Sequence, residues 1–353
     1  MSRRTKNPKA PAFASDALPD PASDAPLLEV TDLRVSFPSE DGRVDAVRGV
    51  NLSVARGEVL ALVGESGSGK SVTSTAVMGL LDESADVSGS ITLHGTEILG
   101  RSDAYMSRIR GVQLSMVFQD PLSALTPVYT VGQQIVEALR IHDEKMSGDK
   151  AWGRAVELLD LVGIPNPTVR AKAYPHEFSG GMRQRAVIAI AIANNPDLII
   201  ADEPTTALDV TVQKQVIDLL SELRERLGFA MVFVSHDLAL VAEVAHRVTV
   251  MYAGQVVEQA ATSELMSNPV HEYTRGLLGA VLSIEAGSKR LHQVRGTVPS
   301  PKEFVKGDRF APRSSHPEVG LESRPVLKPV AGSTEHYYAI TPELEAVLEK
   351  EAH

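Results

Sequence analysis

The stretch Gly64-Glu65-Ser66-Gly67-Ser68-Gly69-Lys70-Ser71 decides the fold of this 353-residue chain. It matches the pattern G-x-x-x-x-G-K-[ST], and it lies between an apolar run, 59–63, and a helix that we expect over 72–81. The glycines of such a loop let successive backbone N–H groups point at phosphate oxygens, and the following helix N-terminus adds positive potential. The sequence therefore predicts a nucleotide site in which Lys70 reaches the β- and γ-phosphates and the Ser71 hydroxyl ligates Mg²⁺.

Apolar runs of strand length recur along the chain. The run 59–63 has no polar residue, which is typical of a central strand covered on both faces, and 198–201 and 231–234 have the same character. Each run leads into a polar or glycine-rich loop and then a helical pattern, so we expect a parallel sheet that binds ligands at the carboxyl ends of its strands. The β-like segments between 28 and 54 predict antiparallel strands, and 121–193 predicts a mostly helical insertion.

Two adjacent carboxylates, Asp202 and Glu203, follow the apolar run 198–201. Two carboxylates at the tip of a buried strand are costly unless a cation compensates them. We expect Asp202 to help hold Mg²⁺, as the corresponding aspartate does in P-loop NTPases, and Glu203 to act as general base on the attacking water. The alternative is an ordinary acidic turn before Pro204, and the phosphate-binding loop upstream favours the catalytic interpretation.

The composition excludes several classes of protein and site. A net charge of −10 argues against a general nucleic-acid binder, so no nucleic-acid partner is expected. The chain contains no cysteine, which rules out disulfides, thiolate zinc sites and cysteine-ligated iron–sulfur clusters. No segment approaches the ~20 apolar residues of a membrane span, and no apolar segment follows Arg3 and Arg4 as in a secretory signal. We expect a cytoplasmic chain that only a partner could hold at a membrane.

The segment Ser179-Gly180-Gly181-Met182, between Phe178 and Arg183, resembles the signature sequence of ATP-binding cassette (ABC) proteins. Other elements resemble further motifs of that family: Gln119 in Val117-Phe118-Gln119-Asp120-Pro121 the Q-loop, Ala207-Leu208-Asp209 the D-loop, His236 in Val234-Ser235-His236-Asp237 the switch histidine, and Phe37 the aromatic residue that stacks on adenine. The resemblance covers about 27–330. It implies an α/β P-loop NTPase with a RecA-like parallel sheet core, an antiparallel β subdomain and a helical insertion.

The resemblance also implies roles for these residues. Ser179, Gly180 and Gly181 would contact the γ-phosphate held by an opposite subunit, so that ATP lies between two cassettes, and Asp209 would join them as a nucleotide-binding residue. Gln119 would sense Mg²⁺ and the attacking water, and it opens the helical insertion that touches the membrane subunits. His236 would hydrogen-bond the γ-phosphate and stabilise the charge that develops on it.

Longer segments resemble the ATPases of oligopeptide, dipeptide and nickel importers. They are Gln119-Asp120-Pro121-Leu122-Ser123-Ala124-Leu125-Thr126-Pro127, Tyr174-Pro175-His176-Glu177-Phe178-Ser179-Gly180-Gly181-Met182-Arg183-Gln184-Arg185, His271-Glu272-Tyr273-Thr274-Arg275-Gly276-Leu277-Leu278, Gly296-Thr297-Val298-Pro299 and Gly307-Asp308-Arg309-Phe310-Ala311-Pro312-Arg313-Ser314. Such importers pair two cassette subunits, usually different chains, with two permease subunits and an extracytoplasmic solute-binding protein. The resemblance implies an ATP-hydrolysing subunit, peripheral on the cytoplasmic face of the cell membrane, that powers uptake of oligopeptides or dipeptides.

Other functions remain alternatives at this point. The same ATPase role in an importer of nickel complexes or other solutes fits the same motifs. Export is a further alternative, and the C-terminal segment after about residue 285 argues against it only because that segment resembles the importer ATPases. A non-transport cassette ATPase in DNA repair would carry a long heptad coiled coil, and one in translation would carry two cassettes in one chain. The sequence shows neither feature.

One departure from the importer ATPases concerns Gly307 to Ser314. In many relatives this segment carries cysteines that bind an iron–sulfur cluster in some members. Here Asp308 and Ser314 occupy those positions, so no such cluster is expected. Any order in this region must come from packing, or the region is looser.

These patterns divide the chain into three parts. Residues 1–26, rich in Pro, Ala, Ser and Asp, predict a disordered leader. The resemblance implies that residues 27–285 form an ABC ATPase domain, with a helical insertion at about 120–193. Residues 286–353 form a Pro-rich extension of the oligopeptide-importer type, with a short helix over 342–352. The basic character of 286–333 fits a solvated face better than a contact with anionic lipid or an acidic permease surface.

Overall fold

The computed structural model describes residues 16–40, 42–206, 208–285, 294 and 296–351. Within these residues the largest sheet has eight strands in the order β11-β12-β10-β9-β3-β8-β7-β6. Its parallel part consists of β9 (Arg247–Tyr252), β3 (Val59–Val63), β8 (Ala230–Ser235), β7 (Leu198–Asp202) and β6 (Leu114–Val117). Residues of β3, β7 and β8 are all buried, as the unbroken apolar runs predict, and so are those of β6, which the sequence analysis did not predict. The parallel sheet is confirmed.

A second sheet is antiparallel and has the order β2-β1-β4-β5. Its strands are β1 (Leu28–Ser39), β2 (Gly42–Val54), β4 (Asp86–Leu93) and β5 (Thr96–Glu97). Helix α1 (Lys70–Val77) contacts β1 and β2 of this sheet and β7 of the parallel sheet. The sequence predicts a helix over 72–81, which is wrong at its C-terminal end. The chain leaves the helix at Gly79, whose φ of +63° is a left-handed conformation that ends helices.

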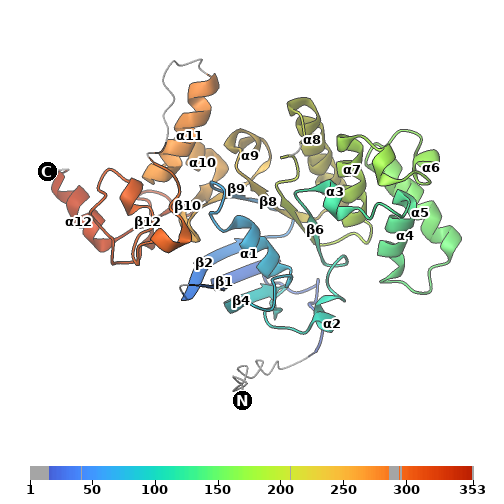
Figure 1. Ribbon diagram of the computed structural model, residues 1–353, viewed down its shortest axis with the longest axis horizontal. Coiled ribbons are helices and arrows are strands. Elements are labelled where there is room, and N and C mark those ends of the chain that lie inside the picture. Colours follow the sequence, from blue (N-terminus) through green and yellow to red (C-terminus); the bar gives the residue numbers. More distant parts are fainter. Residues whose placement is uncertain (1–15, 41, 207, 286–293, 295, 352–353) are drawn as a thin grey trace.

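The helical insertion and the C-terminal extension lie at opposite ends of the molecule (Figure 1). Helices α4, α5 and α7 of the insertion pack against one another, and a capping box at Thr130 starts α4. The insertion contains α3 (Pro121–Ala124), α4 (Val131–Arg140), α5 (Gly148–Leu161), α6 (Pro167–Arg170), the 3-10 helix η1 (Pro175–Glu177) and α7 (Gly180–Ala191).

The remaining helices connect or cover the strands. They are α2 (Asp103–Met106), α8 (Val210–Leu227), α9 (Leu238–Val244), α10 (Thr262–Ser267) and α11 (Glu272–Glu285). None of the helices in the described part of the chain is long and apolar enough to span a bilayer.

The C-terminal extension adds strands to the large sheet, which the sequence does not predict. Strand β12 (Tyr337–Ile340) pairs antiparallel with β10 (Gln255–Ala261) and with β11 (Val326–Pro329). The extension also contains the 3-10 helices η2 (Pro301–Glu303) and η3 (Ala311–Arg313) and the helix α12 (Pro342–Glu351). Asp308 and Ser314, where many importer ATPases carry cysteines, cap local turns: Asp308 accepts from the Phe310 N–H at 2.9 Å, and Ser314 Oγ donates to the Ala311 carbonyl at 2.8 Å.

The N-terminal leader is predicted to be disordered through residue 26, and its first fifteen residues lie outside the described part. The segment 16–26 differs from that prediction, because side chains of the folded domain hold its backbone. The Tyr105 hydroxyl donates to the Ala17 carbonyl at 2.7 Å, and Gln113 Nε2 donates to the Pro19 carbonyl at 2.9 Å. Composition alone does not reveal such contacts, since the partners come from residues about 90 positions away.

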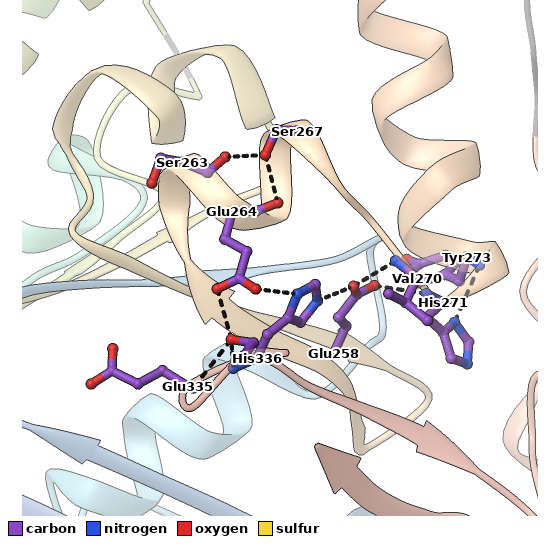
Figure 2. A network of polar contacts seen from close by, with 10 residues as sticks. Glu258, Ser263, Glu264, Ser267, Val270, His271, Tyr273, Glu335 and His336 are labelled. Atoms are coloured by element: carbon purple, nitrogen blue, oxygen red, sulfur yellow. Dashed lines mark hydrogen bonds and ion pairs between the residues drawn. The ribbon is translucent and has the colours of Figure 1, made fainter. Parts of the chain in front are cut away.

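A buried polar network joins the extension to the sheet and to the start of α11 (Figure 2). Glu258 of β10 accepts hydrogen bonds from the Val270 N–H at 2.7 Å and the His271 N–H at 3.0 Å. Its Oε1 also lies 2.6 Å from His336 Nε2, and both of these side chains are fully buried. Burial lowers the pKa of His271 to about 3, so this imidazole is neutral near pH 7 and accepts the Tyr273 N–H through Nδ1. The network fixes where α11 begins.

We expect Glu258→Gln to lower the free energy of unfolding by about 1–3 kcal/mol. The amide replaces one acceptor oxygen with an N–H₂ group, so one buried donor loses its partner. Urea unfolding followed by circular dichroism measures this change. The matched control is Glu264→Gln, since Glu264 contacts the same histidine but its side chain is 32% exposed. If both variants lost the same free energy of unfolding, the burial of Glu258 would not be the cause of its effect.

Candidate functional site

The phosphate-binding loop connects β3 to α1, as the motif predicts. Gly64 and Gly69 have φ angles of +153° and +98°, which side chains disfavour. A Cβ atom on Gly64 would lie 2.2 Å from the Met251 carbonyl oxygen, and one on Gly69 would lie 2.8 Å from the Ala46 carbonyl oxygen. The close approach of neighbouring backbone therefore requires glycine at both positions.

Lys70 closes the loop on itself. Its Nζ donates to the carbonyl oxygens of Gly64 at 2.7 Å and Glu65 at 3.1 Å. The side chain is buried, and this desolvation lowers its pKa, while the carboxylates of Glu203 and Asp202 oppose the shift. The ammonium group is thus held against the backbone carbonyls at the start of the loop.

Three polar side chains in and beside the loop fit a phosphate–Mg²⁺ group: Ser71, Asp202 and Ser68. The Ser71 hydroxyl donates to Asp202 Oδ1 at 3.1 Å, so the structure brings two of the three predicted Mg²⁺ ligands together, while the third, Gln119, donates to Glu203. Asp202 is buried, and desolvation raises its pKa, which disfavours its charge unless a cation lies nearby. The Ser68 hydroxyl is buried and has no hydrogen-bond partner within the described residues, and a phosphate oxygen would satisfy it.

Glu203 lies at the centre of a polar cluster at the strand ends. Its Oε2 accepts hydrogen bonds from Gln119 Nε2 at 3.0 Å and from the Thr206 hydroxyl at 2.8 Å, and it lies 3.6 Å from His236 Nδ1. Glu203 has a φ of +46°, unusual outside glycine, and its N–H donates to the Val234 carbonyl of the neighbouring strand. The structure therefore brings the three predicted catalytic residues together. Thr206 has no predicted role, and only its place beside Glu203 points to it.

A cleft of about 590 Å³ opens over the loop. Besides the loop, it is lined by the three catalytic candidates Gln119, Glu203 and His236 and by Leu277 of α11, which the sequence does not single out. Such a volume is in the range of sites for nucleotide-sized ligands. Phe37 is half-buried and packs against the core between the two sheets, so its stacking on adenine stays a prediction.

The predicted signature and D-loop residues do not line this cleft. Ser179 caps the N-terminus of α7 by accepting the Met182 N–H, and Asp209 caps α8 by accepting the Val212 N–H. Ser179, Gly180 and Asp209 are exposed. The N-termini of α7 and α8, each capped by its own side chain, therefore face away from the nucleotide cleft of this chain.

Comparisons with known proteins identify the family of this chain. Residues 47–206 match the family model of the ABC transporter, and residues 257–317 match that of the oligopeptide/dipeptide transporter C-terminal region. The chain is 55% identical over 82% of its length to an oligopeptide transport ATP-binding protein, OppD, of Mycobacterium tuberculosis, but it spans only 47% of that relative. It is 48% identical to OppD of Bacillus subtilis, with 88% of this chain and 87% of that protein covered. It is 46% identical to the dipeptide transport ATP-binding protein DppD of Lactococcus lactis, with 82% and 83% covered.

Solved structures of ATP-binding cassettes are similar to about two thirds of this chain. A dimeric ATP-binding cassette in a post-hydrolysis state, bound to ADP and phosphate, matches with a TM-score of 0.60 and 28% identity, over 67% of this chain and 98% of that chain. A cassette from Clostridium perfringens, part of the transporter complex cbiONQ, matches with a TM-score of 0.58 and 28% identity, over 69% and 91%.

Proposed function

This chain belongs to the ABC transporter family of ATP-binding proteins, and from this we propose that it is the ATP-hydrolysing subunit of an importer that takes up oligopeptides or dipeptides across the cytoplasmic membrane. The observation that carries the proposal is the position of the Glu203 carboxylate beside the phosphate-binding loop, with Gln119 and His236 around it. The match of 257–317 to the oligopeptide/dipeptide transporter region supports peptides as the transported class.

The geometry suggests how hydrolysis proceeds. The loop N–H groups and Lys70 would bind the β- and γ-phosphates, and Mg²⁺, held by Ser71 and Asp202, would neutralise charge on them. Glu203 would accept a proton from the attacking water, while the Gln119 amide and the Thr206 hydroxyl hold its carboxylate. His236 would donate to the γ-phosphate as negative charge develops.

A second cassette, normally a different chain, would complete this site. The exposed N-termini of α7 and α8 carry Ser179 and Asp209 and do not reach the cleft of their own chain. The similar cassette bound to ADP and phosphate is dimeric, which supports the same arrangement here. Two permease subunits and an extracytoplasmic solute-binding protein would complete the importer, with this chain peripheral on the cytoplasmic face.

Co-expression with candidate permease subunits tests this function. We expect the chain to co-purify with integral membrane subunits after gentle detergent extraction, and the complex in liposomes to accumulate a labelled peptide only with MgATP. The control is the same complex with Glu203→Gln, which should not accumulate peptide. Co-purification with ribosomes or DNA in place of membrane subunits would contradict the importer role.

A further inference from the structure

The C-terminal extension contacts the phosphate-binding loop directly. Arg313, at the end of η3, makes a two-pronged ion pair with Glu65: Nη1 lies 2.7 Å from Oε2 and Nη2 lies 3.3 Å from Oε1. The Arg313 side chain is only 5% exposed, and the Glu65 side chain is 32% exposed. Glu65 also lines the cleft over the loop. An arginine from the extension is thus the counter-ion of a carboxylate inside the nucleotide site.

The Arg313 guanidinium is held in place by groups outside the loop. Its Nη2 donates to the Gly296 carbonyl at 3.2 Å, and its Nη1 donates to the Tyr252 hydroxyl at 3.4 Å. The Tyr252 ring lies at the end of β9 and packs edge-on against Phe310 of the extension, with the centroids 5.3 Å apart. These contacts fix the direction in which the guanidinium points, so it pulls the Glu65 carboxylate toward the extension.

The backbone of Glu65 is held by the same end of the molecule. Its N–H donates to the Tyr273 hydroxyl at 2.8 Å. Burial raises the pKa of Tyr273, so its hydroxyl stays neutral. The polar network around Glu258 fixes the start of α11, and Tyr273 stands in the first turn of this helix (Figure 2). Both the backbone and the side chain of this loop residue therefore depend on residues beyond 250.

The extension also docks on the ATPase domain at points that do not involve Glu65. Arg309 donates to the Asp45 carbonyl at 2.9 Å and to the Ala253 carbonyl, and its guanidinium lies 4.0 Å from the Phe304 ring centre. Arg48 of β2 donates to the Lys306 carbonyl at 2.6 Å. Because docking has these separate contacts, the effect of Arg313 on the loop can be separated from attachment of the extension.

We propose that Arg313 is a positioning residue for nucleotide binding, which neutralises Glu65 and holds its carboxylate away from the phosphates. Without this counter-ion, a carboxylate at the mouth of the loop repels a triphosphate that carries several negative charges. The extension then does more than cover an edge of the sheet, because its Arg313 provides the positive charge that offsets the Glu65 carboxylate of the loop. This inference rests on the proposed ATP site.

A double-mutant cycle on the full chain tests the proposal, with the dissociation constant of MgATP measured by calorimetry. We expect Arg313→Ala to raise this constant about tenfold, which corresponds to 1.4 kcal/mol. Adding Glu65→Gln to Arg313→Ala should restore most of the lost affinity, because the unpaired carboxylate is then gone. An arginine that only fastens the extension would give no such rescue. Unchanged affinity in Arg313→Ala, or a double variant as weak as the single one, would overturn the proposal.

Two further variants serve as controls for the MgATP-binding measurements on Arg313→Ala. Arg324→Ala removes an exposed arginine from the same extension, so the MgATP constant should stay at the wild-type value. Arg309→Ala weakens docking without touching Glu65, and Glu65→Gln should not rescue any loss that it causes. If Arg313→Ala does not fold, Arg313→Gln keeps most of the side-chain volume and is used in the same cycle. Absence of MgATP binding by the wild type would refute the ATP site itself. If the wild type binds MgATP but the effects of Arg313→Ala and Glu65→Gln on the dissociation constant simply add, only the role of Arg313 is refuted.

Discussion

Glu203→Gln is expected to lower the rate of ATP hydrolysis by ~10²–10⁴-fold and to leave MgATP binding intact, since this is the range that loss of a general base costs. The amide of glutamine keeps the shape of the side chain but cannot take a proton from water. Within the described residues the Glu203 side chain accepts hydrogen bonds from Gln119 and Thr206 and none from the phosphate-binding loop. The defect should therefore appear in kcat and not in the affinity for nucleotide.

The measurement compares phosphate release by the assembled transporter with MgATP binding by calorimetry. Glu222→Gln is the matched control, because Glu222 is an exposed residue of α8 away from the cleft, and its turnover should equal that of the wild type. Near-normal turnover in Glu203→Gln would remove this residue from its role. Loss of nucleotide binding in Glu203→Gln would instead show that the glutamate acts in building the loop.

Glu203 could be predicted from its place after a buried apolar run, whereas Gln119 and His236 are predicted only by their resemblance to the Q-loop and the switch histidine. Gln119, Glu203 and His236 come after β6, β7 and β8, which are adjacent in the sheet, and parallel strands bring their carboxyl ends to one edge. The unbroken apolar runs predict β3, β7 and β8, because a strand that is buried on both faces shows no alternation of polar and apolar residues.

The extension could not be predicted in this way. Strands β11 and β12 have a mixed burial pattern, and the position of β12 depends on pairing with β10 and on the buried contact between His336 and Glu258, which are 78 residues apart. Arg313 stands in a segment quoted for its family resemblance, but nothing local indicates that its partner is Glu65, 248 residues upstream. Leu277 of α11 likewise reaches the cleft through the tertiary fold, whereas Thr206 stands only three residues after Glu203 and belongs to no motif that the sequence analysis identified. Contacts between residues far apart in the sequence decide the position of β12 and the partner of Arg313, and no local sequence pattern indicates them.

Lys70→Ala is expected to weaken MgATP binding itself by ~10–100-fold, because a hydrogen bond to a charged group contributes about 1.5–3 kcal/mol. In the structure the ammonium bonds the Gly64 and Glu65 carbonyls from inside the loop, which leaves it placed to meet the phosphates. It also offsets the nearby carboxylates of Asp202 and Glu203. Alanine removes both effects, so repulsion of the triphosphate adds to the lost contact.

Calorimetry on the full chain measures this change, with Lys214→Ala as the control, since Lys214 of α8 has a side chain that is 65% exposed. The control should bind MgATP as the wild type does. The comparison with Glu203→Gln separates the two roles, because Lys70→Ala should lose affinity and turnover together whereas Glu203→Gln loses turnover alone. An unchanged dissociation constant in Lys70→Ala would contradict the assignment of the loop, since an ammonium inside a phosphate-binding ring cannot be removed without cost to a bound triphosphate.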